Sequence, residues 1–240
     1  MSDHDPVTAG FLVLDKPVGP SSMKAVAVVR RRAGGIKTGH GGTLDPLASG
    51  VLVLGLGRAT RLLEKVVATN KEYLTQIDLS MSTATDDLEG EPAYVEVSSP
   101  PELPAVEAVL QSFTGDIMQR PPVYSAIKVD GRRAYALARR DQPVDIPPRQ
   151  VHVESLRLVD YTWPQVTVSI ACGKGFYVRS LARDLGAALG VGGCCVSIRR
   201  TAVGPFSLND AVTLDDVPDP LIAAHVIPVE EGLSRLGSQP

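Results

Sequence analysis

The stretch Gly39–Gly50, GHGGTLDPLASG, holds one carboxylate, that of Asp45, between two glycine-rich flanks. Its simplest interpretation is local. Asp45 would cap a short helix, Pro46 would occupy the first helical position, and Gly50 would end the turn. On this stretch alone, the capping role is the better-supported interpretation.

Regular structure is predicted on both sides of this stretch. Ser21 or Ser22 is a suitable cap for a helix that passes through an arginine run and ends at the pair Gly34-Gly35. The predicted elements nearest to Asp45 are a buried strand at 11–14, this helix at about 21–32, a strand at 51–54 and a helix at 59–68.

The rest of the chain mixes strands and helices without a regular strand–helix–strand repeat. Residues 71–79 alternate with period two, which places Tyr73 and Ile77 on one side of a strand and Glu72 and Gln76 on the other. Further predicted elements are a short strand at 93–97, a helix at 104–113, strands at 151–159 and 165–171, and a helix at 177–189 stopped by Gly190. This order favours an α+β fold.

Composition describes an ordinary globular chain of 240 residues, 44% hydrophobic and 21% charged. No apolar run approaches the roughly 20 residues that a membrane span needs. The N-terminus is acidic and polar, unlike a signal peptide. The three cysteines Cys172, Cys194 and Cys195 lack metal-site spacing, so they are predicted to be reduced core thiols of a cytoplasmic protein.

Charge is unevenly distributed along a chain whose net charge is only −3. Residues 78–107 hold eight acidic side chains and no basic one, and residues 204–240 hold six acidic and one basic. Residues 116–150 hold seven basic and four acidic, and residues 171–203 hold five and one. A polyanion would meet a basic face on an acidic body, although any single charged run is more often just solvated surface.

Several common sites are absent from the sequence. The stretch 51–60 resembles a dinucleotide fingerprint, but Thr60 stands in place of the third glycine and the strand that should read the ribose does not follow. Residues 173–175 lack phosphate-loop spacing, the four histidines are isolated, and no nucleophile elbow is present. The sequence therefore predicts a protein without metal or cofactor.

A second segment carries potential chemistry at 172–186, CGKGFYVRSLARDLG. Two glycines lead into a helix whose first turn presents Tyr177 and Arg179, with Arg183 one turn later. A phosphate or an RNA backbone could bind at such a basic helix start. The alternative is that both arginines merely solvate the outer face and Tyr177 packs.

These segments, in this order, resemble the TruB family of tRNA pseudouridine-55 synthases. The resemblance extends from about Gly10 to Leu214, and the ordered set is far more specific than any one motif. The motifs are LDKPVG (14–19), the Asp45 stretch, KEY (71–73), RPPVYSAIK (120–128), GRRAY (131–135), the segment 173–186 and SIRRT (197–201).

The resemblance implies the pseudouridine synthase fold, a mixed and mostly antiparallel sheet flanked by helices and loops. It implies an isomerase that flips uridine-55 out of the T-loop of tRNA and needs no cofactor. Asp45 would cleave and rejoin the glycosidic bond, with Arg179 pairing it and Tyr73 stacking on the base. The implied substrate-binding residues are His40 beside the flipped nucleotide, Tyr177 and Ile198 around the uracil, and Lys16, Lys128, Arg132, Arg133, Arg199 and Arg200 on the RNA backbone.

The same resemblance implies a domain organisation. A flexible N-terminus at 1–9 would precede a catalytic domain at 10–215, within which 119–149 forms a mobile segment that clasps the RNA. Residues 216–240 would form an acidic, irregular tail in place of the C-terminal RNA-binding (PUA) domain of many relatives. The expected partner is tRNA alone, bound by a cytoplasmic monomer that needs no membrane and no protein partner.

Departures and alternatives remain open at this point. Gly41 stands where relatives carry Thr, which would loosen the turn beside His40, and Ser80 and Ala84 replace a usual Gly and Asp. One alternative is a catalytically silent RNA-binding or tRNA-folding protein on the same scaffold; another is a guide-dependent relative acting on ribosomal RNA in a complex. The residues leave open whether Asp45 attacks the base, attacks the sugar or removes a sugar proton.

Overall fold

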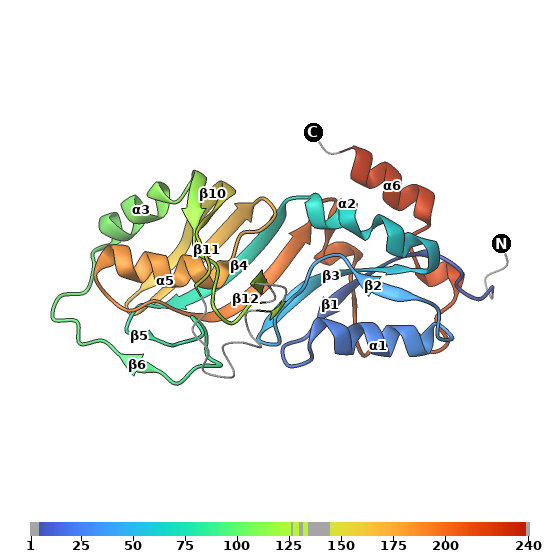
Figure 1. The fold of residues 1–240 in the computed structure, drawn as a ribbon, viewed down its shortest axis with the longest axis horizontal. Helices are drawn as coiled ribbons and strands as arrows, with labels where there is room; N and C mark the ends of the chain where they lie inside the picture. Colours follow the sequence, from blue (N-terminus) through green and yellow to red (C-terminus); the bar gives the residue numbers. More distant parts are fainter. Residues whose placement is uncertain (1–4, 126, 130–131, 134–144, 239–240) are drawn as a thin grey trace. The chain divides into compact units, whose positions relative to one another are not determined.

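The computed structural model describes residues 5–125, 127–129, 132–133 and 145–238 (Figure 1). The chain divides into two compact units. The first unit contains residues 1–73 and 199–240, and the second contains residues 74–198. The chain passes between the units inside strands β4 (Lys71–Asp78) and β12 (Cys194–Val203), which contribute residues to both.

The first unit is built on strands in the order β14-β1-β3-β12, with β2 paired to β3 and β13 paired to β12. Its elements are β1 (Gly10–Lys16), α1 (Ser22–Arg32), β2 (Thr38–His40), β3 (Ala48–Leu56), the 3₁₀ helix η1 (Gly57–Leu62), α2 (Leu63–Ala68), β13 (Phe206–Ser207), η2 (Leu208–Asp210), β14 (Val212–Thr213), η3 (Ala223–His225) and α6 (Val229–Gly237).

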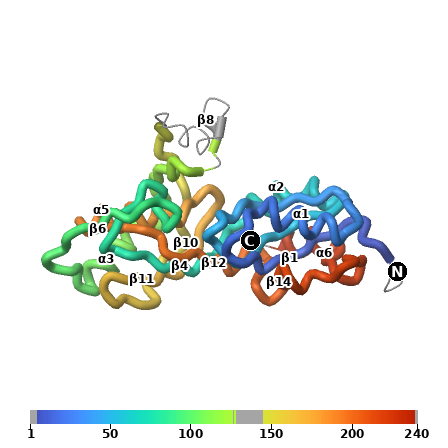
Figure 2. Tube along the Cα trace, turned by 90° about the horizontal axis from the view of Figure 1, so that it is seen from below, coloured from blue at the N-terminus to red at the C-terminus, as the bar shows by residue number. Residues whose placement is uncertain are grey.

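Strands β1 and β3 form the centre of this unit. They run antiparallel, in a register that pairs Gly10 with Leu56 and Lys16 with Gly50. Nearly every residue of both strands is buried, because the strands are covered on both faces. This explains why their sequences are continuous apolar runs rather than alternating ones. Strand β14 pairs with β1 in parallel, and Figure 2 shows the two segments side by side.

Helix α1 begins and ends where the sequence predicts. The Ser21 hydroxyl accepts a hydrogen bond from the Lys24 amide at 3.2 Å, as an N-cap residue does. The helix buries Ala25, Val26 and Val29 and ends at Arg32. In contrast, the helix predicted at 59–68 begins two residues early, at Gly57, as η1 and becomes an α-helix only at Leu63.

The two ends of the chain are more ordered than predicted. Residues 229–237 form α6 instead of an irregular tail, and Gly232 lies so close to Phe11 that a Cβ atom there would be 2.4 Å from its ring. Pro6 forms a β-bridge with Ile222 within the segment expected to be a flexible N-terminus. Packing against the apolar strands orders α6. The acidic side chains of its first turn remain exposed to solvent.

The second unit has strands in the order β12-β4-β11-β10-β7, and β5 pairs separately with β6. Its further elements are β5 (Met81–Ser82), β6 (Ala93–Tyr94), α3 (Leu103–Ser112), β7 (Gly115–Gln119), β8 (Lys128–Val129), β9 (Arg132–Arg133), β10 (Arg149–Thr162), β11 (Gln165–Cys172) and α5 (Val178–Leu189). Strands β7, β10 and β11 pair antiparallel, and so do β8 and β9.

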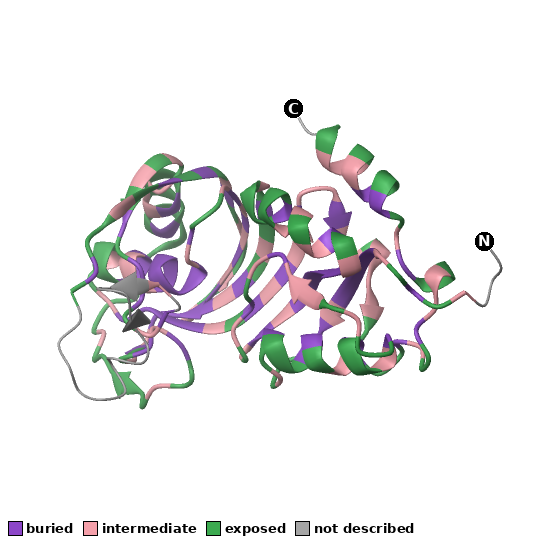
Figure 3. Ribbon diagram, turned by 45° about the vertical axis from the view of Figure 1, so that its right-hand side comes forward, coloured by how far each residue is buried: buried purple, intermediate pink, exposed green. Residues whose placement is uncertain are grey.

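Helix α5 provides the main apolar face against this sheet. It buries Val178, Leu181, Ala182 and Leu185, the positions that its 3.6-residue spacing predicts. Buried residues of both units are purple in Figure 3. It ends at Gly190, whose φ of 69° is the left-handed conformation that favours glycine. The mixture of helices with mostly antiparallel strands confirms the predicted α+β fold.

Two further predictions concern the whole chain. Cys172, Cys194 and Cys195 are buried and form no disulfide among the described residues, so the prediction of core thiols is confirmed. In the part of the chain that the structure describes, no helix has the length and apolarity required to cross a membrane.

Candidate functional site

The Asp45 stretch forms a tight turn rather than the start of a helix. The Ala48 amide donates to the Asp45 carbonyl at 3.1 Å, and strand β3 begins at Ala48, so the capping interpretation is wrong. The Ser22 hydroxyl donates to the Leu44 carbonyl and accepts from the Leu44 amide, both at 2.8 Å. The turn that carries Asp45 is thereby fixed to the first turn of α1, and the half-buried Asp45 has a defined position.

Arg200 holds the same turn through a buried side chain. Its side chain is only 2% exposed. Its Nε donates to the Val51 carbonyl at 2.7 Å, and its Nη atoms donate to the carbonyls of Thr43 at 3.3 Å and Gly42 at 3.2 Å. The prediction that Arg200 contacts the RNA backbone is therefore wrong, because its donors are bound within the protein.

Lys16 is also buried instead of facing RNA. It is 0% exposed, and its Nζ donates to the carbonyls of Pro17 at 2.8 Å and Pro20 at 2.9 Å. Burial lowers the pKa of Lys16 to about 8, although the nearby Asp45 carboxylate acts in the opposite direction. The predicted phosphate contact of Lys16 is therefore wrong, and its ammonium instead supplies positive charge beside Asp45.

The lowered pKa of Lys16 predicts a pH dependence of stability. Between pH 8 and its ordinary value of 10.5, the unfolded chain keeps the Lys16 proton while the folded chain releases it. Its contribution to the unfolding free energy therefore rises with pH in this window, by at most about 1.4 kcal/mol per pH unit. Urea denaturation at pH 7, 8, 9 and 10 should show the difference between wild type and Lys16→Met growing with pH. A constant difference would contradict the lowered pKa.

His40 lies at the end of β2, half-buried beside the same turn. Burial and the Arg200 guanidinium lower its pKa below the ordinary 6.5, so the imidazole is neutral at pH 7. Its Nδ1 is buried without a hydrogen-bond partner among the described residues. Gly41 packs closely at this turn, because a Cβ there would lie 2.6 Å from the Val66 side chain, and the expected loosening stays a prediction.

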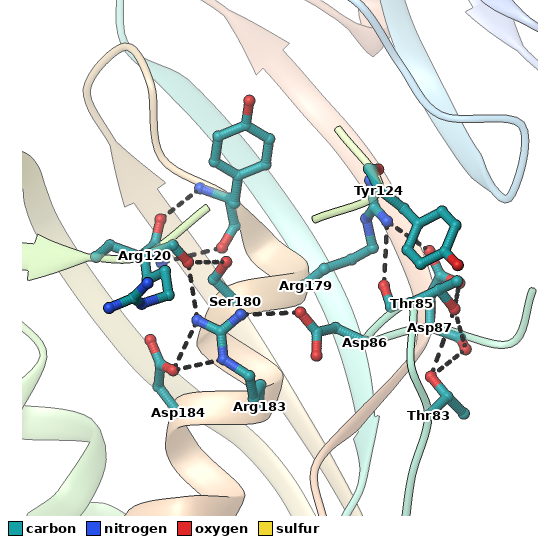
Figure 4. A network of polar contacts seen from close by, with 12 residues as sticks. Thr83, Thr85, Asp86, Asp87, Arg120, Tyr124, Arg179, Ser180, Arg183 and Asp184 are labelled. Carbon is teal, nitrogen blue, oxygen red and sulfur yellow. Dashed lines mark hydrogen bonds and ion pairs between the residues drawn. The ribbon is translucent and has the colours of Figure 1, made fainter. Parts of the chain in front are cut away.

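In the second unit, Arg179 occupies the first turn of α5 and is only 5% exposed. Its Nη1 lies 3.0 Å from Asp87 Oδ2 and donates to the Thr85 carbonyl at 3.1 Å. Its Nη2 donates to the Tyr124 carbonyl at 3.0 Å (Figure 4). Arg179 therefore does not solvate an outer face; it is held inside the unit by a carboxylate and two carbonyls.

Asp87 is the residue that sequence reasoning missed. It is 1% exposed, and its Oδ1 accepts from the Thr85 hydroxyl at 2.6 Å and from the Glu89 amide at 2.9 Å. These bonds orient the carboxylate toward Arg179 and offset part of the cost of its burial. No local pattern names its partner, because Asp87 and Arg179 lie about 90 residues apart in the chain.

Arg183 lies one turn after Arg179 and is held by carboxylates (Figure 4). Its Nη1 lies 2.9 Å from Asp86 Oδ2, its Nε donates to Asp184 Oδ1 at 2.9 Å, and its Nη2 donates to the Arg120 carbonyl at 2.8 Å. Burial raises the pKa of Asp86 above 3.8, although Arg183 acts in the opposite direction. Arg183 is therefore bound within the unit, unlike the basic helix start predicted for it.

Tyr177 is fixed by its backbone. Its amide donates to Gln119 Oε1 at 2.8 Å, and Gln119 Nε2 donates to the Tyr177 carbonyl at 3.1 Å. The Arg149 guanidinium lies 5.2 Å from the centroid of the Tyr177 ring, within the range of a cation–π contact. Gln119 and Arg149 were not predicted, since neither carries a recognisable spacing to Tyr177.

The remaining predicted residues are placed as follows. Tyr73 is half-buried on β4 and Ile198 is 6% exposed on β12. Arg199 pairs with Asp15 at 2.7 Å and stays 40% exposed at its side chain. Lys128, Arg132 and Arg133 belong to the paired strands β8 and β9, whose side chains lie outside the described residues, as does much of 119–149.

The structure therefore assembles two clusters of predicted residues. Asp45, His40, Lys16 and Arg200 come together in the first unit through the turn at 41–46. Arg179 and Tyr177 come together in the second unit at the start of α5. The predicted pairing of Asp45 with Arg179 joins residues of different units and stays a prediction.

Two family profiles match the chain. Residues 30–178 match "TruB family pseudouridylate synthase (N terminal domain)", and residues 179–235 match "tRNA pseudouridylate synthase B C-terminal domain". The second profile begins in α5 and ends within α6, so it includes most of the segment at 216–240.

Curated relatives and solved structures agree with the profiles. The chain is 44% identical over 237 residues to tRNA pseudouridine synthase B of Corynebacterium efficiens, covering 97% of this chain and 79% of the relative. It is 46% identical over 237 residues to the protein of that name from Dinoroseobacter shibae, covering 97% and 78%.

Among solved structures, a chain of the Cbf5-Nop10-Gar1 complex matches with a TM-score of 0.75 and 28% identity, covering 96% of this chain but 63% of that one. A chain of an H/ACA RNP bound to a substrate RNA containing 2'-deoxyuridine matches with a TM-score of 0.71 and 25% identity, covering 97% and 66%. This chain thus spans a little under two thirds of those longer relatives. The predicted fold family is confirmed by these neighbours.

Proposed function

The chain belongs to the TruB family of pseudouridylate synthases, and from this premise we propose that it converts uridine-55 in the T-loop of tRNA to pseudouridine. The observation that carries the proposal is the similarity of 97% of the chain to relatives named tRNA pseudouridine synthase B. The match includes the Asp45 turn, which lies within the family profile at 30–178.

The reaction is an isomerisation that conserves atoms and electrons. The bond between N1 of uracil and C1′ of ribose breaks, the base turns, and a bond forms between C5 and C1′. The proton on C5 is lost and N1 gains one. The protein must therefore supply a carboxylate as nucleophile or base, and a means of moving one proton.

Asp45 is the carboxylate that we assign to this role. The turn that carries it is held by Ser22 and Arg200, so the carboxylate is positioned before RNA arrives. In a site closed over RNA, a carboxylate is protonated unless cations stabilise its charged form. Lys16 supplies one such charge in the first unit. We propose that Arg179 supplies the second when the site forms.

The target uridine must leave its stacked position to reach Asp45. We propose that Tyr73 stacks on the flipped uracil, and base–aromatic stacking contributes about 1–3 kcal/mol per base. Tyr177 and Ile198 would line the uracil pocket. The neutral His40 would lie beside the flipped nucleotide, where it can donate or accept a hydrogen bond without adding charge.

We propose that the RNA backbone is bound by the predicted cations that the structure does not show to be buried. Of the predicted contacts we retain Arg199, which is partly exposed, together with Lys128, Arg132 and Arg133. These contacts add salt-dependent affinity rather than sequence choice. We further propose that residues 119–149 clasp the RNA and that the catalytic domain, 10–215, acts as a cytoplasmic monomer on tRNA without a protein partner.

The direct test is to incubate the purified protein with an unmodified tRNA transcript and map pseudouridine by position. Pseudouridine at position 55, formed without guide RNA or added protein, is expected. Product that appears only in the presence of a guide RNA would instead favour an activity like that of the RNP complexes among the structural neighbours. Binding of tRNA without any product would favour a silent RNA-binding protein on the same scaffold.

A further inference from the structure

We propose that a groove between α1 and β2 binds the backbone of the substrate RNA beside the target nucleotide. This inference rests on the proposed function, and it adds a binding surface that none of the family motifs discussed above includes. The groove lies in the first unit and encloses about 360 Å³. Its lining includes Met23, Val26, Ala27, Arg30, Arg31 and Thr38.

The groove is part of an uninterrupted basic region of sequence. Residues 17–44 contain five lysines and arginines and no aspartate or glutamate. Arg32 points elsewhere, because its Nη1 donates to the carbonyls of Leu214 at 3.1 Å and Asp215 at 3.3 Å. The other four, Lys24, Arg30, Arg31 and Lys37, are exposed.

These exposed cations differ from three paired arginines of the same unit, although Arg61 and Lys65 also form no ion pair among the described residues. Arg58 pairs with Glu230, Arg199 with Asp15, and Arg235 with Asp210. Within the described part of the chain, by contrast, none of Lys24, Arg30, Arg31 and Lys37 forms an ion pair. A polyanion would therefore supply the negative charge that these four cations do not find within the described part of the chain.

Helix stabilisation explains only part of this pattern. Cations in the last turn interact favourably with the helix dipole, which accounts for arginines at 30–32. Lys24 lies in the first turn, where a cation is unfavourable for the helix dipole. It is seven residues before Arg31, so the two side chains lie on the same side of the helix. Met23 is 62% exposed and adds an apolar side chain to the lining of the groove.

The groove begins next to the candidate catalytic residue. Ser22 of α1 exchanges two hydrogen bonds with Leu44, and the Gly19 amide donates to the Pro46 carbonyl at 2.8 Å. Helix α1 has 11 residues and is therefore about 16 Å long. An RNA strand with one nucleotide at Asp45 can reach Arg30 and Arg31 within that length.

The chemistry of the lining fits RNA backbone. A guanidinium binds phosphate oxygens with two parallel hydrogen bonds, and Arg30 and Arg31 present two such groups. Arg30 already uses Nε on the Gly35 carbonyl at 3.3 Å, which leaves its Nη atoms for a ligand. Met23 and Ala27 offer an apolar surface to a ribose or base edge between phosphates. Thr38 leads along β2 to His40 at the target nucleotide.

The test measures the dissociation constant of unmodified tRNA transcript as a function of salt. The double variant Arg30→Gln, Arg31→Gln should raise the dissociation constant about tenfold at 0.1 M salt. It should also lower the slope of the logarithm of this constant against log salt by about 1.5, because each phosphate contact contributes about 0.7–0.9 to the slope. Arg30→Lys with Arg31→Lys should keep the slope. Lys24→Gln should lower the slope by up to about 1, and it removes no cation that stabilises the helix.

A matched control carries the same loss of charge on another exposed helical segment of this unit. Arg61→Gln with Lys65→Gln, on η1 and α2, should leave the slope unchanged. An unchanged slope in the Arg30 and Arg31 variant, or an equal fall in the control, would overturn the groove proposal. Position-55 product from wild type would show that the proposed function survives that result, whereas its absence would show that the function itself fails.

Discussion

Replacing Asp45 with asparagine is expected to lower the single-turnover rate of pseudouridine formation by about 10³-fold or more. The amide has nearly the same shape and still accepts hydrogen bonds, so the turn between Leu44 and Ala48 should persist. The asparagine side chain lacks the negative charge that a nucleophile or base requires at the glycosidic bond. Affinity for tRNA should change by no more than about threefold, because phosphate contacts dominate it.

The measurement is product formed at position 55 with protein in excess over transcript, beside a binding titration. Glu230→Gln is the matched control, since its carboxylate is also in the first unit but is 73% exposed and pairs with Arg58 on the surface. That variant should keep the wild-type rate. An Asp45→Asn protein with a rate within tenfold of wild type would exclude a chemical role and leave Asp45 as a turn residue.

Replacing Asp87 with alanine is expected to reduce the unfolding free energy by about 3–5 kcal/mol. Arg179 and Asp87 are 5% and 1% exposed, so the variant removes a carboxylate from beside a buried guanidinium. The Thr85 hydroxyl and the Glu89 amide lose an acceptor at the same time. Activity should fall as well, because the position of Arg179 depends on this carboxylate.

Urea denaturation separates the two effects. Glu230→Ala breaks an exposed ion pair and should cost less than about 1 kcal/mol. Asp87→Asn keeps one oxygen for Thr85 and Glu89, so it should lie between wild type and Asp87→Ala in stability. An Asp87→Ala protein destabilised by less than about 1 kcal/mol would show that Arg179 does not rely on Asp87 in the folded chain.

Local patterns in the sequence were sufficient for most of the secondary structure. The Ser21 cap, the period of α5 and the stop at Gly190 all depend on contacts between residues a few positions apart. The apolar runs of β1 and β3 predict strands but not how far they extend, because both are lengthened by pairing with each other. The short 3₁₀ turn before α2 and the order of α6 were missed for the same reason, since packing rather than propensity determines them.

Residue type alone could not separate cations that are buried from those that face solvent. Arg199 and Arg200 are neighbours in sequence, yet Arg199 is partly exposed beside Asp15 while Arg200 is 2% exposed. The acceptors that bury Arg200 are carbonyls of Gly42, Thr43 and Val51, about 150 residues away in the chain. No local pattern contains that information.

The sequence by itself determined the kind of fold and, through the resemblance, the reaction class and Asp45 as the candidate reaction centre. The tertiary structure alone decided which charges serve that centre. Burying a cation or carboxylate is favourable only where distant segments supply acceptors, donors or an opposite charge. Lys16, Asp87 and Arg200 meet that condition through the fold, whereas Arg30 and Arg31 do not, and they remain on the surface where RNA can bind them.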